Sequence, residues 1–255
     1  MKIIFLGKKD NKVYDFLSSN EDVYAFEPEK EIAIEEVKEI SPDLIISYGY
    51  KKIIKDDIVE KFKNKIINLH ISYLPWNRGA YPNIWSFLDN TPKGVTIHYI
   101  DSGIDTGDIL FQKSIFFENI NQETFESTYN RCSREIENLF IENWTNIKNS
   151  NFQPVKQDKK EGTFHTIKQS NKVFKDIGLH QNWNEKITRF LKERRTDDKI
   201  IDDIQNIRKQ NNTHWMDVVR LAFRESPKEA RNIFKKIKFC DYKVNELLKE
   251  LSENE

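Results

Sequence analysis

Short apolar runs separated by helical patterns dominate the first third of the chain, and this alternation leaves few folds open to it. Ala33, Val37 and Ile40, for example, recur at helical spacing among glutamates before a Ser-Pro pair ends the segment. Strands that alternate with surface helices are typical of a layered α/β unit with a mostly parallel sheet, which is the fold class we predict. The expected strands are residues 3–6, 23–26, 44–47 and 66–69.

Two further strands and a long helix are expected in the middle of the chain. Residues 94–100 alternate in side-chain type and residues 109–117 follow a glycine-containing turn, so both favour antiparallel or edge strands. A helix is expected from Asn121 to near Ser150, because apolar residues continue along one of its faces. Residues 151–168 contain a proline, a glycine and a charged run, which are typical of a surface loop.

The last third of the sequence has a helical pattern. We therefore expect residues 1–168 to form a catalytic domain and residues 169–255 to form a C-terminal helical domain. We also expect a homodimer, although the apolar stripes of the helical domain fit self-association, a cover over the rim of a site, or contact with another enzyme. These stripes are Ile200, Ile204 and Ile207; Val218, Leu221 and Ala222; and Val244, Leu248 and Leu251.

Charge and cysteine usage exclude several classes of partner. Lys+Arg and Asp+Glu both number 41, so bulk attraction to nucleic acid or to an acidic membrane surface is not expected. The N-terminus enters a strand directly, without a longer apolar segment or a cleavage site, which favours a cytoplasmic protein. Cys132 and Cys240 have no neighbour at metal-ligand spacing, so we expect neither a metal site nor a disulfide.

Residue types that carry chemistry are concentrated between Asn68 and Leu110. Alternation along a strand places Asn68 and His70 on the same side, where both side chains reach one small polar group. An amide donor or an imidazolium stabilises the oxyanion of acyl transfer to an amine, while a base removes the proton from the attacking nitrogen. Asp105, in a glycine-bracketed loop, is the candidate carboxylate for orienting the imidazole. A structural role fits the same residues, with Asn68 capping the loop that follows the strand.

A resemblance to a known family extends this interpretation. The segment from Leu44 to Leu110 contains, in order, Asn-x-His, Ser-x-Leu-Pro-x-x-Arg-Gly, Gly-Val-Thr-Ile and Asp-x-Gly-x-Asp-Thr-Gly-Asp. Together these motifs resemble the folate-dependent formyltransferase family, which includes methionyl-tRNA formyltransferase, glycinamide ribonucleotide transformylase and the sugar N-formyltransferases. The resemblance implies a Rossmann-like formyltransferase fold in which Asn68 and His70 polarise the formyl oxygen and Asp105 supports proton transfer.

The resemblance also implies 10-formyltetrahydrofolate as the formyl donor. In the family, the pterin is held largely by backbone groups in the loop after a central strand and near the catalytic aspartate. The matching residues here are Tyr48, Gly49, Tyr50, Ile53, Asp101 and Ile104. The Gly-Lys-Lys sequence after the first strand lacks the G-x-G-x-x-G fingerprint, so NAD binding is excluded.

The expected acceptor is an amino sugar linked to a nucleotide. The Trp-Asn-Arg-Gly-x-x-Pro-Asn stretch resembles sugar N-formyltransferases that act on dTDP-linked amino-dideoxy sugars for surface polysaccharide such as O-antigen, and it implies dTDP-4-amino-4,6-dideoxyglucose. An aromatic surface beside a fixed cation suits a nucleobase and a phosphate. Tyr81 and His165 fit packing roles equally well. The residues expected to bind this substrate are Trp76, Asn77, Arg78, Tyr81, His165 and Lys168.

Other interpretations stay open at this point. A dTDP-3-amino sugar, a purine precursor and methionyl-tRNA are alternative acceptors, and a non-catalytic binder of folate or sugar nucleotide is an alternative function. The helical C-terminal pattern lacks the β-barrel and the basic charge of the tRNA-directed enzymes, which argues against tRNA. The intact trio of Asn68, His70 and Asp105 argues against a binder without activity.

Overall fold

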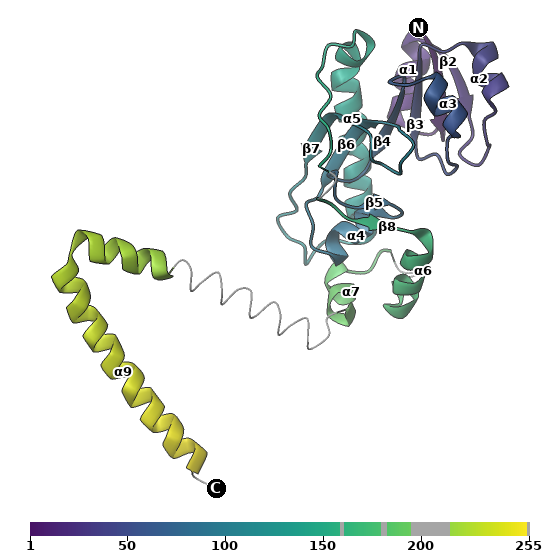
Figure 1. Ribbon diagram of the computed structural model, residues 1–255. Coiled ribbons are helices and arrows are strands. Elements are labelled where there is room, and N and C mark those ends of the chain that lie inside the picture. Colours follow the sequence, from purple (N-terminus) through teal and green to yellow (C-terminus); the bar gives the residue numbers. More distant parts are fainter. Residues whose placement is uncertain (159–160, 180–182, 195–214, 254–255) are drawn as a thin grey trace. The chain divides into compact units, whose positions relative to one another are not determined.

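A six-stranded sheet forms the centre of the N-terminal part of the chain (Figure 1). The computed structural model describes residues 1–158, 161–179, 183–194 and 215–253. The sheet strands are β1 (Lys2–Gly7), β2 (Asp22–Phe26), β3 (Leu44–Tyr48), β4 (Ile66–His70), β6 (Gly94–Tyr99) and β7 (Ile109–Ser114). In the order β2-β1-β3-β4-β6-β7, neighbours are parallel from β2 to β4, while β6 is antiparallel to both β4 and β7. This arrangement confirms the predicted, mostly parallel α/β sheet.

Helices cover both faces of this sheet. Ile3 and Phe5 of β1 belong to the core cluster shared with α1 and α5, whereas Ile4 and Leu6 belong to the cluster shared with α2 and α3, because successive strand residues point to opposite faces. A third cluster joins α4, the start of α5, α6 and α7. The helices are α1 (Lys12–Asn20), α2 (Ile34–Ile40), α3 (Asp56–Lys61), α4 (Pro82–Leu88), α5 (Phe125–Lys148), α6 (Ile167–Asp176) and α7 (Ile187–Arg194).

The long helix α5 begins at Phe125 rather than at the expected Asn121. Thr124 is its N-cap: the Thr124 Oγ1 accepts a hydrogen bond from the N–H of Ser127, and the Ser127 Oγ accepts one from the N–H of Thr124. This reciprocal pair satisfies N–H groups that have no partner within the helix. Residues 120–122 form a turn instead, so the capping residues, and not the apolar pattern, set the start of the helix.

A short two-stranded sheet ties the segment after α5 to the loop after β4. It pairs β5 (Arg78–Gly79) with β8 (Phe164–His165) in parallel. The approach is close enough to require glycine: a Cβ on Gly79 would lie 2.4 Å from the backbone oxygen of His165, and the φ of Gly79 is +88°. Gly162, with φ +97°, is held equally tightly, because its Cβ would lie 2.0 Å from the backbone oxygen of Pro75.

The chain divides into two compact units, Met1–Arg194 and Arg195–Glu255. Lys168 lies near the start of α6, whose Phe174 is buried in the first unit. The expected domain boundary after Lys168 stays a prediction.

In the second unit, residues 215–225 are helical, and a 27-residue helix, α9 (Pro227–Glu253), follows. The two helices meet where the rings of Phe223 and Phe234 lie 5.5 Å apart and Ala230 is buried. The helical character expected of the C-terminal part is confirmed for these residues, whereas the stripe of Ile200, Ile204 and Ile207 lies outside the described residues. In the described ranges, every helix is too short or too polar to cross a membrane.

Candidate active site

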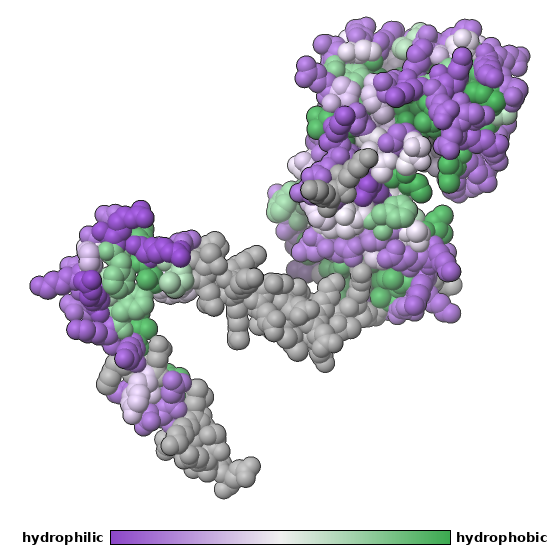
Figure 2. All heavy atoms as spheres, viewed as in Figure 1, coloured by the Kyte–Doolittle hydropathy of each residue, from purple (hydrophilic) through white to green (hydrophobic). Residues whose placement is uncertain are grey.

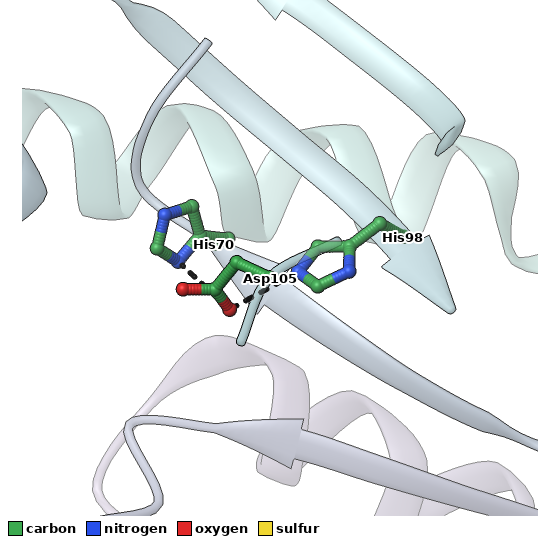
Figure 3. Close-up of side chains that lie close together, drawn as sticks. All are labelled: His70, His98 and Asp105. Carbon is green, nitrogen blue, oxygen red and sulfur yellow. Dashed lines mark ion pairs between the residues drawn. The ribbon is translucent and has the colours of Figure 1, made fainter. Parts of the chain in front are cut away.

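Four polar side chains meet where β4 lies beside β6. Asn68 and His70 occupy alternate positions of β4, and the antiparallel register places His98 of β6 directly opposite Asn68. Asp105 lies in the loop between β6 and β7, in a left-handed conformation with φ +54°. Figure 3 shows the rings of His70 and His98 on two sides of the Asp105 carboxylate. The structure therefore brings the Asn68, His70 and Asp105 trio together and adds His98 to it.

The two oxygens of the Asp105 carboxylate have different surroundings. Oδ1 lies 3.3 Å from the Asn68 Nδ2 that donates to it, 3.5 Å from the His98 Nε2 and 3.8 Å from the His70 Nδ1. Oδ2 accepts a hydrogen bond of 2.9 Å from the backbone N–H of Gly79. One oxygen is thus held by the backbone, while the other faces the side chains that carry or move protons.

Backbone carbonyls set the hydrogen positions on both imidazoles. The His98 Nδ1 lies 2.8 Å from the carbonyl oxygen of Tyr99, and a carbonyl only accepts, so Nδ1 carries the hydrogen. The His98 Nε2 of a neutral ring then has a lone pair, which accepts from the Asn68 Nδ2 at 3.3 Å. The His70 Nε2 lies 3.4 Å from the carbonyl oxygen of Asn77, an arrangement that leaves the Nδ1 lone pair of a neutral His70 facing Asp105.

Burial and charge act in opposite directions on the pKa values of this site. Burial lowers the pKa of His70 below its ordinary value, and the nearby Asp105 charge only partly offsets that effect. Burial alone would raise the pKa of Asp105, but the charged forms of His70 and His98, together with the Gly79 N–H, outweigh it and hold this pKa well below its usual range. At neutral pH the site therefore contains an ionised carboxylate beside an imidazole that resists protonation.

The loop that supplies the Gly79 N–H is fixed from within by Asn77. The Asn77 Nδ2 donates to the Oγ1 of Thr91 at 2.8 Å, and its Oδ1 accepts from the Oγ1 of Thr163 at 3.2 Å. Asn77 has an exposed fraction of 0 %. This placement favours a structural role for the Asn77 side chain over the expected contact with substrate.

Gln157 supports the aspartate loop from the other side. Its Nε2 donates to the backbone oxygens of Asp105, at 2.9 Å, and Gly107, at 2.7 Å. Because Gln157 follows α5, the segment after that helix helps to position the carboxylate. This contact was not predicted, since nothing in the local pattern around Gln157 relates it to a loop 50 residues away.

The residues expected to hold the pterin lie in two loops, the first of which follows β3. Gly49 has φ +69°, and Ile53 exposes 79 % of its surface. The hydroxyl of Tyr48 donates to Glu137 of α5 at 3.1 Å, and the hydroxyl of Tyr50 donates to the backbone oxygen of Lys30 at 2.7 Å. These two tyrosine side chains are therefore engaged in the fold, which leaves the backbone of the loop and Ile53 for a ligand.

The second of these loops contains Asp101, Ile104 and Asp105. The Asp101 Oδ1 accepts hydrogen bonds from the Gly103 N–H, at 3.1 Å, and from the Thr106 Oγ1, at 2.6 Å. Asp101 therefore folds the loop, whereas Ile104 is half exposed. Each of the two loops thus exposes the apolar side chain of an isoleucine.

The residues expected on the acceptor side fall into an accessible group and a buried one. Trp76 and Arg78 are half-buried, and Lys168 is exposed at the start of α6. Tyr81 is also exposed, with its ring 5.1 Å from that of Phe174. The Arg78 Nε is buried and has no hydrogen-bond partner among the described residues, so it is a donor that an anionic ligand would satisfy.

His165 belongs to the buried group. Its ring stacks on Trp85 at 3.8 Å between centroids, and its Nε2 lies 3.0 Å from the Oδ2 of Asp89. This environment favours packing over contact with substrate. Its backbone is paired with that of Gly79, whose N–H donates to Asp105.

His70, His98 and Asp105 also form a group that has the donor types of a metal site. Their ligand atoms all lie within 4.8 Å of one another. The Asn68 amide already donates to the His98 Nε2 and to the Asp105 Oδ1, so two of these atoms have partners within the protein. The absence of a metal stays a prediction.

Comparisons with known proteins relate the chain to one family. Residues 7–143 match the family described as formyl transferase. The crystal structure of the formyltransferase PseJ from Anoxybacillus kamchatkensis, in complex with UDP-4,6-dideoxy-4-formamido-L-AltNAc and tetrahydrofolate, has a TM-score of 0.69 and 40 % identity; the match covers 76 % of this chain and 100 % of that one. An N-formyltransferase from Helicobacter canadensis, in complex with folinic acid and dTDP-3-aminofucose, has a TM-score of 0.58 and 27 % identity over 66 % of this chain and 72 % of that one.

The curated relatives are longer proteins. A methionyl-tRNA formyltransferase from Fusobacterium nucleatum is 34 % identical over 163 residues, which are 62 % of this chain and 52 % of the relative. The chain thus spans about half the length of the curated relatives it matches.

Proposed function

This chain belongs to the formyl transferase family, and from that premise we propose that it transfers a formyl group from 10-formyltetrahydrofolate to the amino group of a nucleotide-linked amino-dideoxy sugar. The convergence of Asn68 and His70 on the Asp105 carboxylate supports this proposal. An amide donor, an imidazole and an ionised carboxylate are the groups that acyl transfer to an amine requires.

The chemistry assigns a separate task to each member of the trio. The amine nitrogen bonds to the formyl carbon while the bond from that carbon to the folate nitrogen breaks, so one proton leaves the amine and one reaches the folate nitrogen. His70 takes up the proton at Nδ1, where the neutral ring has its lone pair, and Asp105 stabilises the imidazolium that results. Asn68 donates to the formyl oxygen with the amide hydrogen that contacts Asp105 in the unliganded site, while its other amide hydrogen stays on the His98 Nε2.

The residues around the trio fit a folate donor. A flat pterin ring needs an apolar surface and backbone hydrogen-bonding groups, and the loop after β3 supplies both through Gly49 and the exposed Ile53. Ile104 adds apolar surface from the aspartate loop. PseJ and the H. canadensis enzyme, crystallised with tetrahydrofolate and folinic acid, support the same donor here.

For the acceptor, we put a UDP-linked 4-amino-4,6-dideoxy sugar first. Its support is the identity of 40 % over the whole length of PseJ, which was crystallised with such a sugar in its formylated form. A dTDP-linked sugar, including dTDP-4-amino-4,6-dideoxyglucose, is the second candidate, supported by the Trp-Asn-Arg-Gly stretch and by the dTDP-3-aminofucose complex. In either case the Arg78 guanidinium is the group we assign to a phosphate. Such a product would enter surface polysaccharide.

The test is formyl transfer by the full chain to a panel of amines, with product mass and release of tetrahydrofolate as readouts. The panel contains the UDP-linked 4-amino sugar, the dTDP-linked 4-amino and 3-amino sugars, and methionyl-tRNA. A gain of one formyl group on a sugar nucleotide, absent without the donor, is the expected result. Turnover of methionyl-tRNA alone would replace the proposed acceptor, and folate binding without turnover of any amine would indicate a binder.

A further inference from the structure

Helix α9 exposes a row of apolar side chains along most of its length. The exposed fractions of Ile233, Ile237, Val244 and Leu247 lie between 41 % and 60 %. In Figure 2 apolar side chains lie at the surface of the helices after residue 214. We call Ala230, Ile233, Ile237, Val244 and Leu247 the α9 seam.

The spacing of the seam is that of a coiled coil. Its members are separated by three and four residues in turn, and the sequence continues the same spacing through positions 240 and 251. The mean interval of 3.5 residues is shorter than the 3.6 of a straight helix, so the seam winds slowly around α9. A second helix with the same repeat can supercoil around α9 and so remain in contact with the seam along its length. A flat surface would contact only part of a seam that winds around the helix.

The helix before α9 covers only the first part of the seam. Phe223 packs on Phe234, the side chain of Arg231 lies over the Phe223 ring, and Ala230 is buried. Residues 215–225 span roughly 16 Å as a helix, against roughly 40 Å for α9. Residues from Ile237 onward therefore need another cover.

We propose that α9 pairs in parallel with α9 of a second copy of this chain. In the part of the seam that the preceding helix leaves uncovered, Ile237 and Val244 occupy a positions of the repeat and Leu247 occupies a d position. β-branched residues at a with leucine at d favour two parallel strands. In a parallel pair in register, each seam residue from Ile237 onward meets its own copy, so the apolar rows match along the part of α9 that the preceding helix leaves uncovered. Lysines at positions 235 and 238, both exposed, lie outside the seam and remain in water.

The first test compares two substitutions in α9 of the full chain by light scattering. Val244→Glu places a charge in the seam, whereas Tyr242→Glu places the same charge on the opposite side of the helix; both residues are exposed in the single chain, by 53 % and 62 %. The expected result is that Val244→Glu halves the mass of the assembly and Tyr242→Glu leaves it unchanged. A monomeric wild-type chain would overturn the proposal, and so would an unchanged assembly mass for Val244→Glu. An unchanged mass is the result expected if the seam covers the chain's own catalytic unit or another molecule instead.

The second test fixes the direction of the pair by oxidative cross-linking, in a full chain whose Cys240 is first replaced by serine. Leu247→Cys lies in the seam, where a parallel pair brings the two copies of this residue together. Lys235→Cys lies outside the seam and is the matched control, and the remaining native thiol, Cys132, is buried. We expect a covalent dimer from Leu247→Cys and none from Lys235→Cys; equal cross-linking of both variants, or none of either, would contradict a parallel pair. Neither test depends on formyl transfer.

Discussion

Replacing His98 by leucine is expected to lower the kcat of formyl transfer through Asn68, without a direct contact between His98 and substrate. The His98 Nε2 accepts a hydrogen bond of 3.3 Å from the Asn68 Nδ2. The Asn68 Nδ2 also donates to the Asp105 Oδ1, so two contacts orient the Asn68 amide. His98 is 1 % exposed, so it does not reach a bound ligand directly. Leucine fills a similar volume but offers no acceptor.

The size of the effect follows from the value of a single orienting hydrogen bond. Such a bond contributes about 0.5–1.5 kcal/mol, which corresponds to a loss of roughly 2- to 13-fold in kcat. Removing the oxyanion donor itself by Asn68→Ala is expected to cost about 10²- to 10³-fold. The KM for the folate is expected to stay unchanged in His98→Leu. His98→Gln, which retains an acceptor near the position of Nε2, is expected to recover most of the loss.

A double-mutant cycle, measured by steady-state kinetics, tests whether His98 acts through Asn68. If His98 works by orienting Asn68, then His98→Leu has no further effect on kcat in a chain that already carries Asn68→Ala. The same fold reduction in both backgrounds would refute the reasoning, because it would mean that His98 acts independently of Asn68. Thermal unfolding of each variant controls for a general loss of the fold.

Four further changes test other parts of the site. Asp105→Asn is expected to lower kcat by about 10²- to 10⁴-fold and to change the stability by no more than about 1–2 kcal/mol. Asp108→Asn, in the same loop, is the control and is expected to leave kcat near the wild-type value. Similar losses of kcat in both variants would implicate the loop and not the Asp105 carboxylate. Because burial lowers the pKa of His70, the unfolded chain binds more protons than the folded chain below about pH 6.5. The free energy of unfolding should therefore fall as the pH drops below this value, and it should fall less steeply in His70→Gln. Parallel curves for the two proteins in urea titrations at a series of pH values would contradict this. Gly79→Ala is expected to destabilise the protein by about 2–4 kcal/mol in denaturant unfolding, since its Cβ meets a backbone oxygen at a positive φ; wild-type stability would contradict the close approach. Arg78→Ala is expected to raise the KM for the sugar nucleotide more than that for the folate, and unchanged kinetics would remove Arg78 from the acceptor site.

The central strands of the sheet could be predicted because each contains an apolar run that is buried. β1, for example, is apolar and buried from Ile3 to Leu6 on both faces of the sheet, and the helices between the strands repeat at helical spacing. The start of α5 was wrong because a cap depends on the side chains of two residues, Thr124 and Ser127, which the apolar pattern does not include. Local chemistry of this kind shifts a boundary without changing the fold.

The site was predictable only in part, for a similar reason. Asn68 and His70 share one strand, so their common direction follows from alternation alone. His98 is 30 residues further along, and its place beside Asn68 depends on the pairing of β4 with β6, which no local pattern specifies. The signal available in the sequence was a histidine that follows Val95 and Ile97 in an alternating strand pattern. For Asn77, the motif that suggested substrate binding gave no sign that its partners, Thr91 and Thr163, would bury its side chain.

The pairing of β5 with β8 means that the catalytic unit does not end where the family match ends. Asp105 is held by the N–H of Gly79 and by the amide of Gln157, and β5, which contains Gly79, is in turn fixed by residues 163–165. A chain cut at residue 143 would keep Asn68, His70 and Asp105 but would lose Gln157 and residues 163–165, which position the Asp105 carboxylate. Fusion partners and truncations therefore belong beyond Arg194, where the compact unit that contains this pairing and the buried residues of α6 and α7 ends.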